Sequence, residues 1–176
     1  MANKALIVID MQNDFVYGSL KNTDAEAIIP NIKKKIEEYK ASDDIIIFTR
    51  DTHQSNYLET PEGQKLPIPH CINGTWGWLV VDELNYPEYY HINKPTFGYK
   101  HWDYEFDIND NVKEIELVGT CTDICIISNA LILKAEHPHI DIVVDASCCA
   151  GLTPEKHRAA LEVMESCQIK VINKGE

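Results

Sequence analysis

The sequence lacks any apolar run long enough to cross a membrane. Its longest runs, such as residues 6–9 and 45–48, fall far short of the ~18 residues that a span requires. The N-terminal segment also lacks the apolar length and the cleavage site of a signal peptide. We therefore expect a cytoplasmic protein without a transmembrane helix and, at 176 residues, a single domain covering residues 1–176.

Basic side chains are also scarce. Sixteen lysines and arginines stand against 28 acidic residues, which gives a formal charge of −12. This charge repels phosphate backbones and anionic lipid, so we expect neither nucleic acid nor a membrane surface as a partner. The six cysteines should stay reduced in the cytosol, so their even number does not predict disulfides.

Short β-branched runs recur along the chain and are apolar throughout rather than alternating. Continuous apolar strands are typical of a parallel sheet that is covered on both faces, and helical patterns lie between several of the runs. The pattern predicts an α/β protein with three layers, α/β/α, around a mainly parallel central sheet. The expected strands are residues 5–9, 45–49, 115–118, 140–144 and 169–172, and the expected helices are around residues 29–39, 124–134 and 154–166.

The interval from residue 51 to residue 111 differs from the rest of the chain. It is rich in proline, glycine, histidine and aromatic residues, with only short strand-like pieces near residues 78–81 and 89–92. A long irregular stretch inside a compact protein is usually functional.

Reactive side chains stand where the expected strands end. Asp10 follows the first strand, Asp51 follows the second, and the turn at residues 119–123 leads from another strand into a helix that carries Cys125. Ligands of open parallel sheets bind beyond the carboxyl ends of the strands. The sequence therefore predicts that an acid, a second carboxylate and a cysteine converge.

Cys125 is the cysteine with the most informative position. A thiol in the first turn of a helix lies at the positive end of the helix dipole, which lowers its pKa and favours the thiolate. Residue 131 is Leu rather than the Arg of a C-x5-R phosphatase, and Cys121 and Cys125 do not have C-x-x-C spacing. On position alone, a reactive nucleophile and a buried structural cysteine both stay open.

A second group has the composition of a metal site. Asp51 and His53 lie on the same side of an extended segment, His70 follows in the same irregular interval, and Glu62 lies between them. Two imidazoles with carboxylates suit a catalytic divalent ion, with zinc expected first and iron or manganese also compatible. Loop histidines without a metal are the alternative interpretation.

Several motifs together resemble the isochorismatase-like cysteine hydrolases, and nicotinamidases (pyrazinamidases) among them. The resemblance covers essentially the whole chain. The matching motifs are LIVIDMQNDF at residues 6–15, GSL at 18–20, DTH at 51–53, PHCINGT at 69–75 and GTCTDIC at 119–125.

The resemblance implies a catalytic triad of Asp10, Lys94 and Cys125. In such a triad the thiol attacks an amide carbonyl, the carboxylate moves the proton, and the ammonium stabilises both negative charges. A cis peptide is implied between Thr120 and Cys121, with the N–H groups of Cys121 and Cys125 as the oxyanion hole. The implied metal ligands are Asp51, His53, His70 and Glu62.

The implied activity is hydrolysis of nicotinamide to nicotinate and ammonia in NAD salvage. Alternatives are a carbamoyl or ureido amide hydrolase and a non-catalytic ligand-binding relative, whereas Cys125 argues against a vinyl-ether-cleaving isochorismatase. The expected partners are a small amide and, as is common in the family, further copies of the chain in a homo-oligomer.

Aromatic residues are expected to hold a flat ring. Phe15 is the first candidate and Trp78 the next, while Trp76, Phe97 and Tyr99 are equally compatible with ordinary packing. Two departures from the family pattern bear on the site: Cys121 stands where Ala is common, and residues 15–18 lack the usual Pro-Gly pair.

Overall fold

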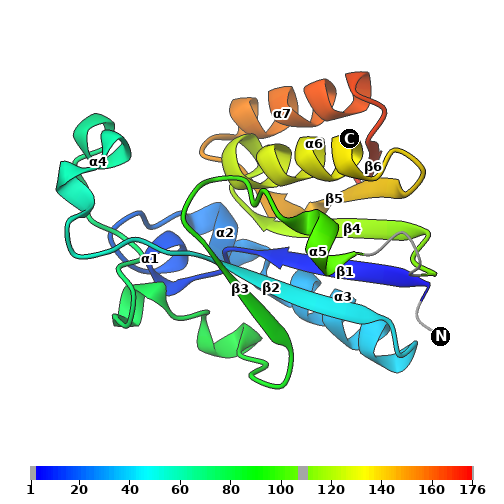
Figure 1. Ribbon diagram of the computed structural model, residues 1–176, viewed down its shortest axis with the longest axis horizontal. Helices are drawn as coiled ribbons and strands as arrows, with labels where there is room; N and C mark the ends of the chain where they lie inside the picture. Colours follow the sequence, from blue (N-terminus) through cyan, green and yellow to red (C-terminus); the bar gives the residue numbers. More distant parts are fainter. Residues whose placement is uncertain (1–2, 107–110, 176) are drawn as a thin grey trace.

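The computed structural model of the chain describes residues 3–106 and 111–175. Within them, six strands form one sheet in the order β3-β2-β1-β4-β5-β6, and every neighbouring pair is parallel (Figure 1). The strands are β1 (Lys4–Ile9), β2 (Ile45–Asp51), β3 (Tyr90–Lys94), β4 (Glu114–Thr120), β5 (Asp141–Ala150) and β6 (Lys170–Ile172).

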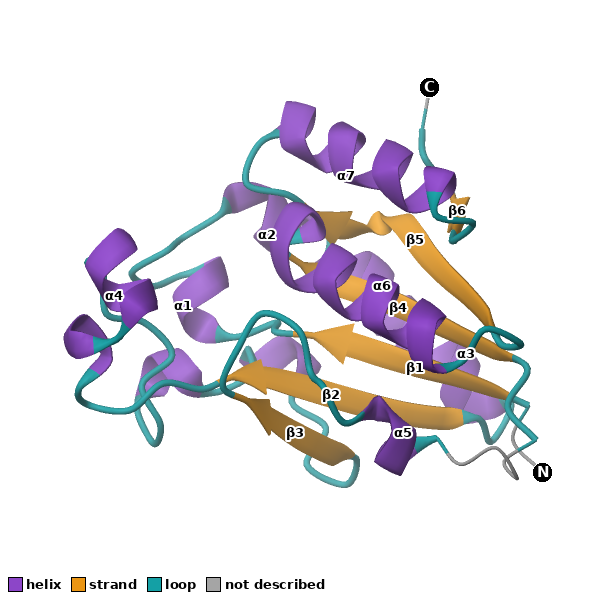
Figure 2. Ribbon diagram, turned by 45° about the horizontal axis from the view of Figure 1, so that its top comes forward, coloured by secondary structure: helices purple, strands orange, loops and turns teal. Residues whose placement is uncertain are grey.

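Helices cover both faces of this sheet (Figure 2). One face carries α3 (Ile29–Ala41), which α2 (Thr23–Ala27) precedes, and the other carries α5 (Trp102–Glu105), α6 (Ile127–Glu136) and α7 (Pro154–Ser166). Two short helices, α1 (Asn13–Val16) and α4 (Pro61–Lys65), lie beyond the carboxyl ends of β1 and β2. This arrangement confirms the predicted three-layer α/β/α fold.

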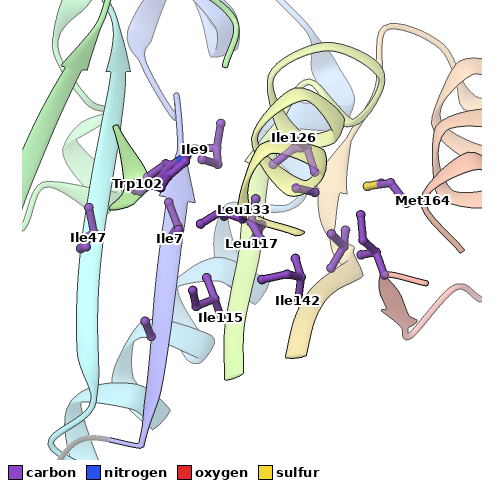
Figure 3. Close-up of a cluster of buried hydrophobic side chains, with 14 of the residues drawn as sticks. Ile7, Ile9, Ile47, Trp102, Ile115, Leu117, Ile126, Leu133, Ile142 and Met164 are labelled. Atoms are coloured by element: carbon purple, nitrogen blue, oxygen red, sulfur yellow. The ribbon is translucent and has the colours of Figure 1, made fainter. Parts of the chain in front are cut away.

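Successive residues of β1 explain why the strands are apolar throughout. Ile7 and Ile9 pack in the same cluster as Leu133 of α6 and Met164 of α7 (Figure 3). Leu6 and Val8 belong to a second cluster, which includes Ile32 and Ile36 of α3. Because side chains alternate along a strand, a sheet that is buried on both faces requires apolar residues at every position.

Most predicted elements are confirmed, with two differences. The helix expected from residue 124 begins instead as a π-helical turn, Thr122–Ile126, before α6. The strand-like piece at residues 78–81 is wrong, since a 3₁₀ turn, Trp76–Trp78, precedes a single bridge between Gln12 and Val80. Of the irregular interval, residues 107–110 lie outside the described residues. No helix among those described is long and apolar enough to span a membrane.

The centre of the sheet determines where a ligand can bind. The chain proceeds outward from β1 to β2 and β3, and then outward on the other side from β4 to β5 and β6, so the direction switches between β1 and β4. Such a switch point opens a crevice at the carboxyl ends of the strands. At this end of β4, Gly119 has a φ of 121°, and a Cβ atom there would overlap the carbonyl oxygen of Ile9. Only glycine permits this approach of β4 to β1.

Candidate active site

The carboxyl ends of four strands deliver the predicted side chains to one place. Asp10 directly follows β1, Asp51 and Lys94 end β2 and β3, and Cys125 lies in the π-helical turn after β4. A cavity of about 580 Å³ opens there. Its lining residues are Phe15, Gly18, Ser19, Leu20, Lys21, Asn22, Asp51, Glu62, Leu66, His70, Phe97, Cys121, Ile124, Cys125 and Leu152.

Asp10, Lys94 and Cys125 form a buried charged cluster beneath this cavity. The Lys94 ammonium lies 2.5 Å from Asp10 Oδ2 and 3.6 Å from Cys125 Sγ. Asp10 and Lys94 are completely buried, and Cys125 is 5% exposed. The structure therefore brings together the three side chains that the resemblance implies as a triad.

Thr49 of β2 holds Asp10 in place. The Thr49 hydroxyl donates to Asp10 Oδ1 at 2.6 Å, and the Asp10 N–H contacts the same hydroxyl oxygen at 3.2 Å. The backbone of Asp10 has a φ of 50°, an unusual value for a residue other than glycine. The residue with this conformation directly follows β1, at the point where the Asp10 carboxylate contacts Lys94.

The pKa of the Cys125 thiol differs from the prediction made from helix position. Burial raises this pKa well above its usual value, and although Lys94 lowers it, the charge of Asp10 raises it further. The expectation of a lowered pKa is therefore wrong, because the loss of solvent outweighs the nearby ammonium. The resting thiol is protonated and needs a base.

Asp10 and Lys94 have the protonation properties that this thiol requires. Burial raises the pKa of Asp10 while Lys94 opposes that rise, and the net direction is upward. Burial alone would lower the pKa of Lys94, but the charges of Asp10, Cys125 and Asp51 raise it. Lys94 stays a cation, and a carboxylate with a raised pKa is a stronger base toward a neighbouring thiol.

The turn that carries Cys125 has the implied backbone form. The peptide bond between Thr120 and Cys121 is cis. Both Cys121 and Cys125 line the cavity. Asn129, a buried residue of α6, donates to the carbonyl oxygen of Cys125 at 2.8 Å and to that of Phe97 at 3.1 Å. One amide side chain thereby joins this turn to the loop after β3.

The four predicted metal ligands also come together at the cavity. Asp51, His53, Glu62 and His70 each offer a ligand atom, and these atoms lie within 4.8 Å of one another. Asp51 Oδ2 is 3.0 Å from His53 Nε2 and 3.4 Å from His70 Nε2. Burial raises the pKa of Asp51, but hydrogen bonds from both histidines outweigh this effect and the net pKa is lowered. The carboxylate is ionised.

Two further observations support a divalent cation as the ligand of this group. Asp51 Oδ1 is buried and makes no hydrogen bond within the protein. His70 Nδ1 lies 2.9 Å from the carbonyl oxygen of Ile68, which favours a proton on Nδ1, so that Nε2 could give up its own proton and ligate a cation in the group. Two nitrogens and two carboxylates are a donor set that divalent transition metals accept.

Of the predicted aromatic residues, Phe15 and Phe97 line the cavity, whereas Trp78 does not. Phe15 lies with its ring centroid 5.6 Å from that of His70. The Trp78 ring instead packs against the Arg50 guanidinium at 4.0 Å, and its Nε1 donates to the Thr52 hydroxyl at 2.9 Å. Trp76 and Tyr99 also lie outside the lining residues.

The sequence analysis missed residues that hold the site together. Gln12 is completely buried; its Oε1 accepts from Asp51 N at 2.7 Å, and its Nε2 donates to Asp51 O at 2.8 Å. Tyr57 packs edge-on against the rings of His53 and His70, at centroid distances of 4.8 and 5.0 Å. A polar residue three positions beyond an apolar strand was the one available signal for Gln12, and Tyr57 had none.

Comparisons with known proteins support a class of α/β hydrolases. An uncharacterized isochorismatase family protein of Bacillus subtilis, PncA, is 30% identical over 171 residues, covering 90% of this chain and 92% of that protein. The structure of a Pyrococcus horikoshii pyrazinamidase in complex with zinc is 27% identical, has a TM-score of 0.82, and aligns over 97% of this chain and 98% of its own. An N-carbamoylsarcosine amidase of Thermoplasma acidophilum, at 22% identity, has a TM-score of 0.80 over 100% of this chain and 98% of its own, which shows the fold alone.

The family itself is defined more directly. Residues 4–176 match the model of the Isochorismatase domain, so the chain belongs to the isochorismatase family. The resemblance that the motifs indicated is thereby confirmed.

Proposed function

We propose that this protein hydrolyses nicotinamide to nicotinate and ammonia through a thioester on Cys125, and thereby serves NAD salvage. Its family and relatives make it an amidohydrolase. The observation that carries the proposal is the buried contact among Asp10, Lys94 and Cys125 beside a cavity that Cys125 lines together with Asp51, Glu62 and His70, three members of the candidate metal group.

The acylation step follows from the protonation states of the cluster. Asp10 accepts the proton of the Cys125 thiol as the sulfur attacks the amide carbonyl, and Lys94 stabilises the negative charge on both groups. The N–H groups of Cys121 and Cys125 serve as the oxyanion hole. When the C–N bond breaks, Asp10 returns the proton to the leaving nitrogen, and ammonia departs.

The second half of the reaction uses the same residues. A water molecule attacks the thioester carbonyl while Asp10 takes its proton. The C–S bond then breaks, the proton returns to the Cys125 sulfur, and nicotinate is released. Lys94 stays cationic throughout, because its raised pKa keeps the ammonium charged beside Asp10.

The cavity wall supports an aromatic amide as the substrate. Phe15, Phe97 and Ile124 supply flat or apolar surface near Cys125. Asp51, His53, His70 and Glu62 would hold a divalent ion, for which zinc is the first choice. When bound, such an ion supplies a Lewis-acidic position for the pyridine nitrogen of nicotinamide.

Ammonia release from a panel of amides tests the substrate. Nicotinamide and its analogue pyrazinamide should be hydrolysed rapidly, and carbamoyl and ureido compounds slowly; the reverse ranking overturns the nicotinamidase assignment. Cys125→Ala should abolish turnover, while the matched variant Cys167→Ala, at an exposed cysteine, should retain it. Turnover in Cys125→Ala would contradict the mechanism.

Metal analysis tests the second part of the site. Purified protein should contain about one equivalent of a divalent metal, and Asp51→Asn should lose it because this carboxylate contacts both histidines. The exposed Asp82→Asn serves as the control. Wild-type protein that holds no metal after incubation with zinc contradicts the proposed site.

A further inference from the structure

The turn that carries Cys125 is held from outside by the segment that joins β5 to α7 and by the first turns of α7. Cys121, the residue before this turn, makes no side-chain capping hydrogen bond to it. Instead, the Thr122 hydroxyl lies 2.7 Å from His157 Nδ1, and the Leu152 N–H donates to Asp123 Oδ1 at 3.0 Å. Both contacts act on the residues between the cis peptide and the thiol.

The contact between Thr122 and His157 involves a buried hydroxyl, so its loss should affect the nucleophile turn. Thr122 is completely buried and His157 is half-buried. Burial lowers the pKa of His157, although Asp123 opposes that shift, so the imidazole is neutral near pH 7. A buried hydroxyl that loses its hydrogen-bond partner is costly, so this contact restrains the turn.

The first turns of α7 hold His157 rigidly toward the nucleophile turn. The Thr153 hydroxyl accepts from the Lys156 N–H at 3.2 Å, and the His157 N–H donates to the Thr153 carbonyl at 2.9 Å. At Gly151, a Cβ atom would lie 2.9 Å from the Cβ of His157, so the end of β5 passes close against the helix. The backbone and Cβ of His157 are therefore held by this junction, and its imidazole reaches Thr122 from there.

We propose that His157 is a positioning residue for catalysis, which acts through Thr122 to hold the Cys125 thiol and the N–H groups of Cys121 and Cys125 in register with the substrate carbonyl. His157 is not among the residues that line the cavity, so it does not touch the substrate. The inference rests on the proposed role of Cys125 as nucleophile. Small displacements of the reacting groups lower the reaction rate strongly. A hydrogen bond that does not touch the substrate can therefore still affect kcat.

The decisive measurement separates kcat from KM in variants of both partners. His157→Ala and Thr122→Val should each lower kcat for ammonia release by about ten-fold, the scale expected when a buried group loses its partner, while KM changes by less than about two-fold. The double variant should be no slower than either single variant, because both remove the same hydrogen bond.

Conservative replacements provide the rescue. His157→Asn places a hydrogen-bonding atom at the same number of bonds from Cα as Nδ1 and should restore most of kcat, whereas His157→Gln, one bond longer, should not. Lys156→Ala, at the exposed neighbouring position, is the matched control and should keep wild-type kinetics. Thermal unfolding of each variant checks that the fold is retained.

The outcomes distinguish this inference from the proposed function. Wild-type kcat in His157→Ala, additive losses in the double variant, or no rescue by Asn would each overturn the role of His157 while wild-type turnover stands. If the wild type releases ammonia from no amide, the proposed function fails first, and the positioning role with it.

Discussion

Two lysines that pair with buried carboxylates have contrasting surroundings on this sheet. Lys35 of α3 joins Glu116 of β4 and Asp145 of β5, at 2.8 and 2.7 Å. Lys94 joins Asp10 at 2.5 Å and lies 3.6 Å from the Cys125 thiol. Both lysines belong to ion clusters with buried carboxylates. Cys125, in the Lys94 cluster, lines the cavity at the carboxyl ends of the strands, whereas Lys35, Glu116 and Asp145 do not.

The partners of the carboxylates show the difference. In the Lys35 cluster every carboxylate oxygen has an ion-pair or hydrogen-bond partner. Lys35 pairs with Glu116 Oε1 and Asp145 Oδ2, Tyr39 donates to Glu116 Oε2 at 2.6 Å, and Ser147 and Asn173 donate to Asp145 at 2.7 and 3.0 Å. The active-site group includes a protonated thiol, and beside it the buried Asp51 Oδ1 makes no hydrogen bond within the protein. A cluster in which every polar atom has a partner stabilises the fold. Polar groups without partners beside a cavity are suited to chemistry.

The largest effect should come from removing the base. Asp10→Asn keeps the shape of the side chain but cannot accept the thiol proton, so kcat should fall by about 10²- to 10⁴-fold. Glu116→Gln makes the equivalent change in the Lys35 cluster and should leave kcat unchanged. Ammonia release measured for both variants checks the contrast, and equal losses would show that the two clusters do not differ in function.

The next effect is on stability and belongs to Lys35. Its side chain is 15% exposed, and Lys35→Met leaves Glu116 and Asp145 buried without their cation. The free energy of unfolding should fall by about 3 kcal/mol, as measured by urea denaturation. The kcat of the folded fraction should stay at the wild-type value. Unchanged stability would mean that the cluster contributes no net stabilisation.

A smaller effect is expected on the acid side of the stability curve. Burial raises the pKa of Asp145, but hydrogen bonds from Lys35 and Ser147 outweigh it, and the net pKa is lowered. The unfolded chain therefore binds a proton first as the pH falls below about 4, and the stabilisation from Asp145 is lost as the pH falls further, through the lowered folded pKa. Asp145→Asn should make the decline in unfolding free energy between pH 5 and pH 2 shallower; an unchanged slope would contradict this linkage.

Much of the candidate active site could be predicted because a parallel sheet brings the residues that follow its strands to the same edge. Asp10, Asp51 and Cys125 each follow an apolar run, and the carboxyl ends of parallel strands meet at one edge of the sheet. Lys94 could not be placed in this way, since its strand is short and lies at the sheet edge; the family motifs indicated its role. The apolar periodicity likewise predicted the layers, because both sheet faces are buried.

Other features depend on packing that a local pattern does not contain. The pKa of Cys125 is raised mainly by burial, which depends on tertiary packing, whereas its position at a helix start predicted a lowered pKa. Trp78 was predicted from its residue type to contact the substrate, but its ring and its Nε1 contact Arg50 and Thr52. The contacts of Asn129 and His157 join segments some 30 residues or more from their own positions in the chain, and no spacing rule predicts them.

The smallest predicted effect concerns the residue that departs from the family pattern. Cys121 shares the cavity and the turn with Cys125, yet in the proposed mechanism only its backbone N–H acts. The Cys121 sulfur accepts a hydrogen bond from the Thr120 hydroxyl at 3.2 Å. Cys121→Ala should therefore change kcat by less than about two-fold, since the backbone donor of the oxyanion hole is kept. A loss of ten-fold or more at unchanged KM would show that the Cys121 side chain takes part in the reaction, and the active-site cluster would then extend beyond Asp10, Lys94 and Cys125.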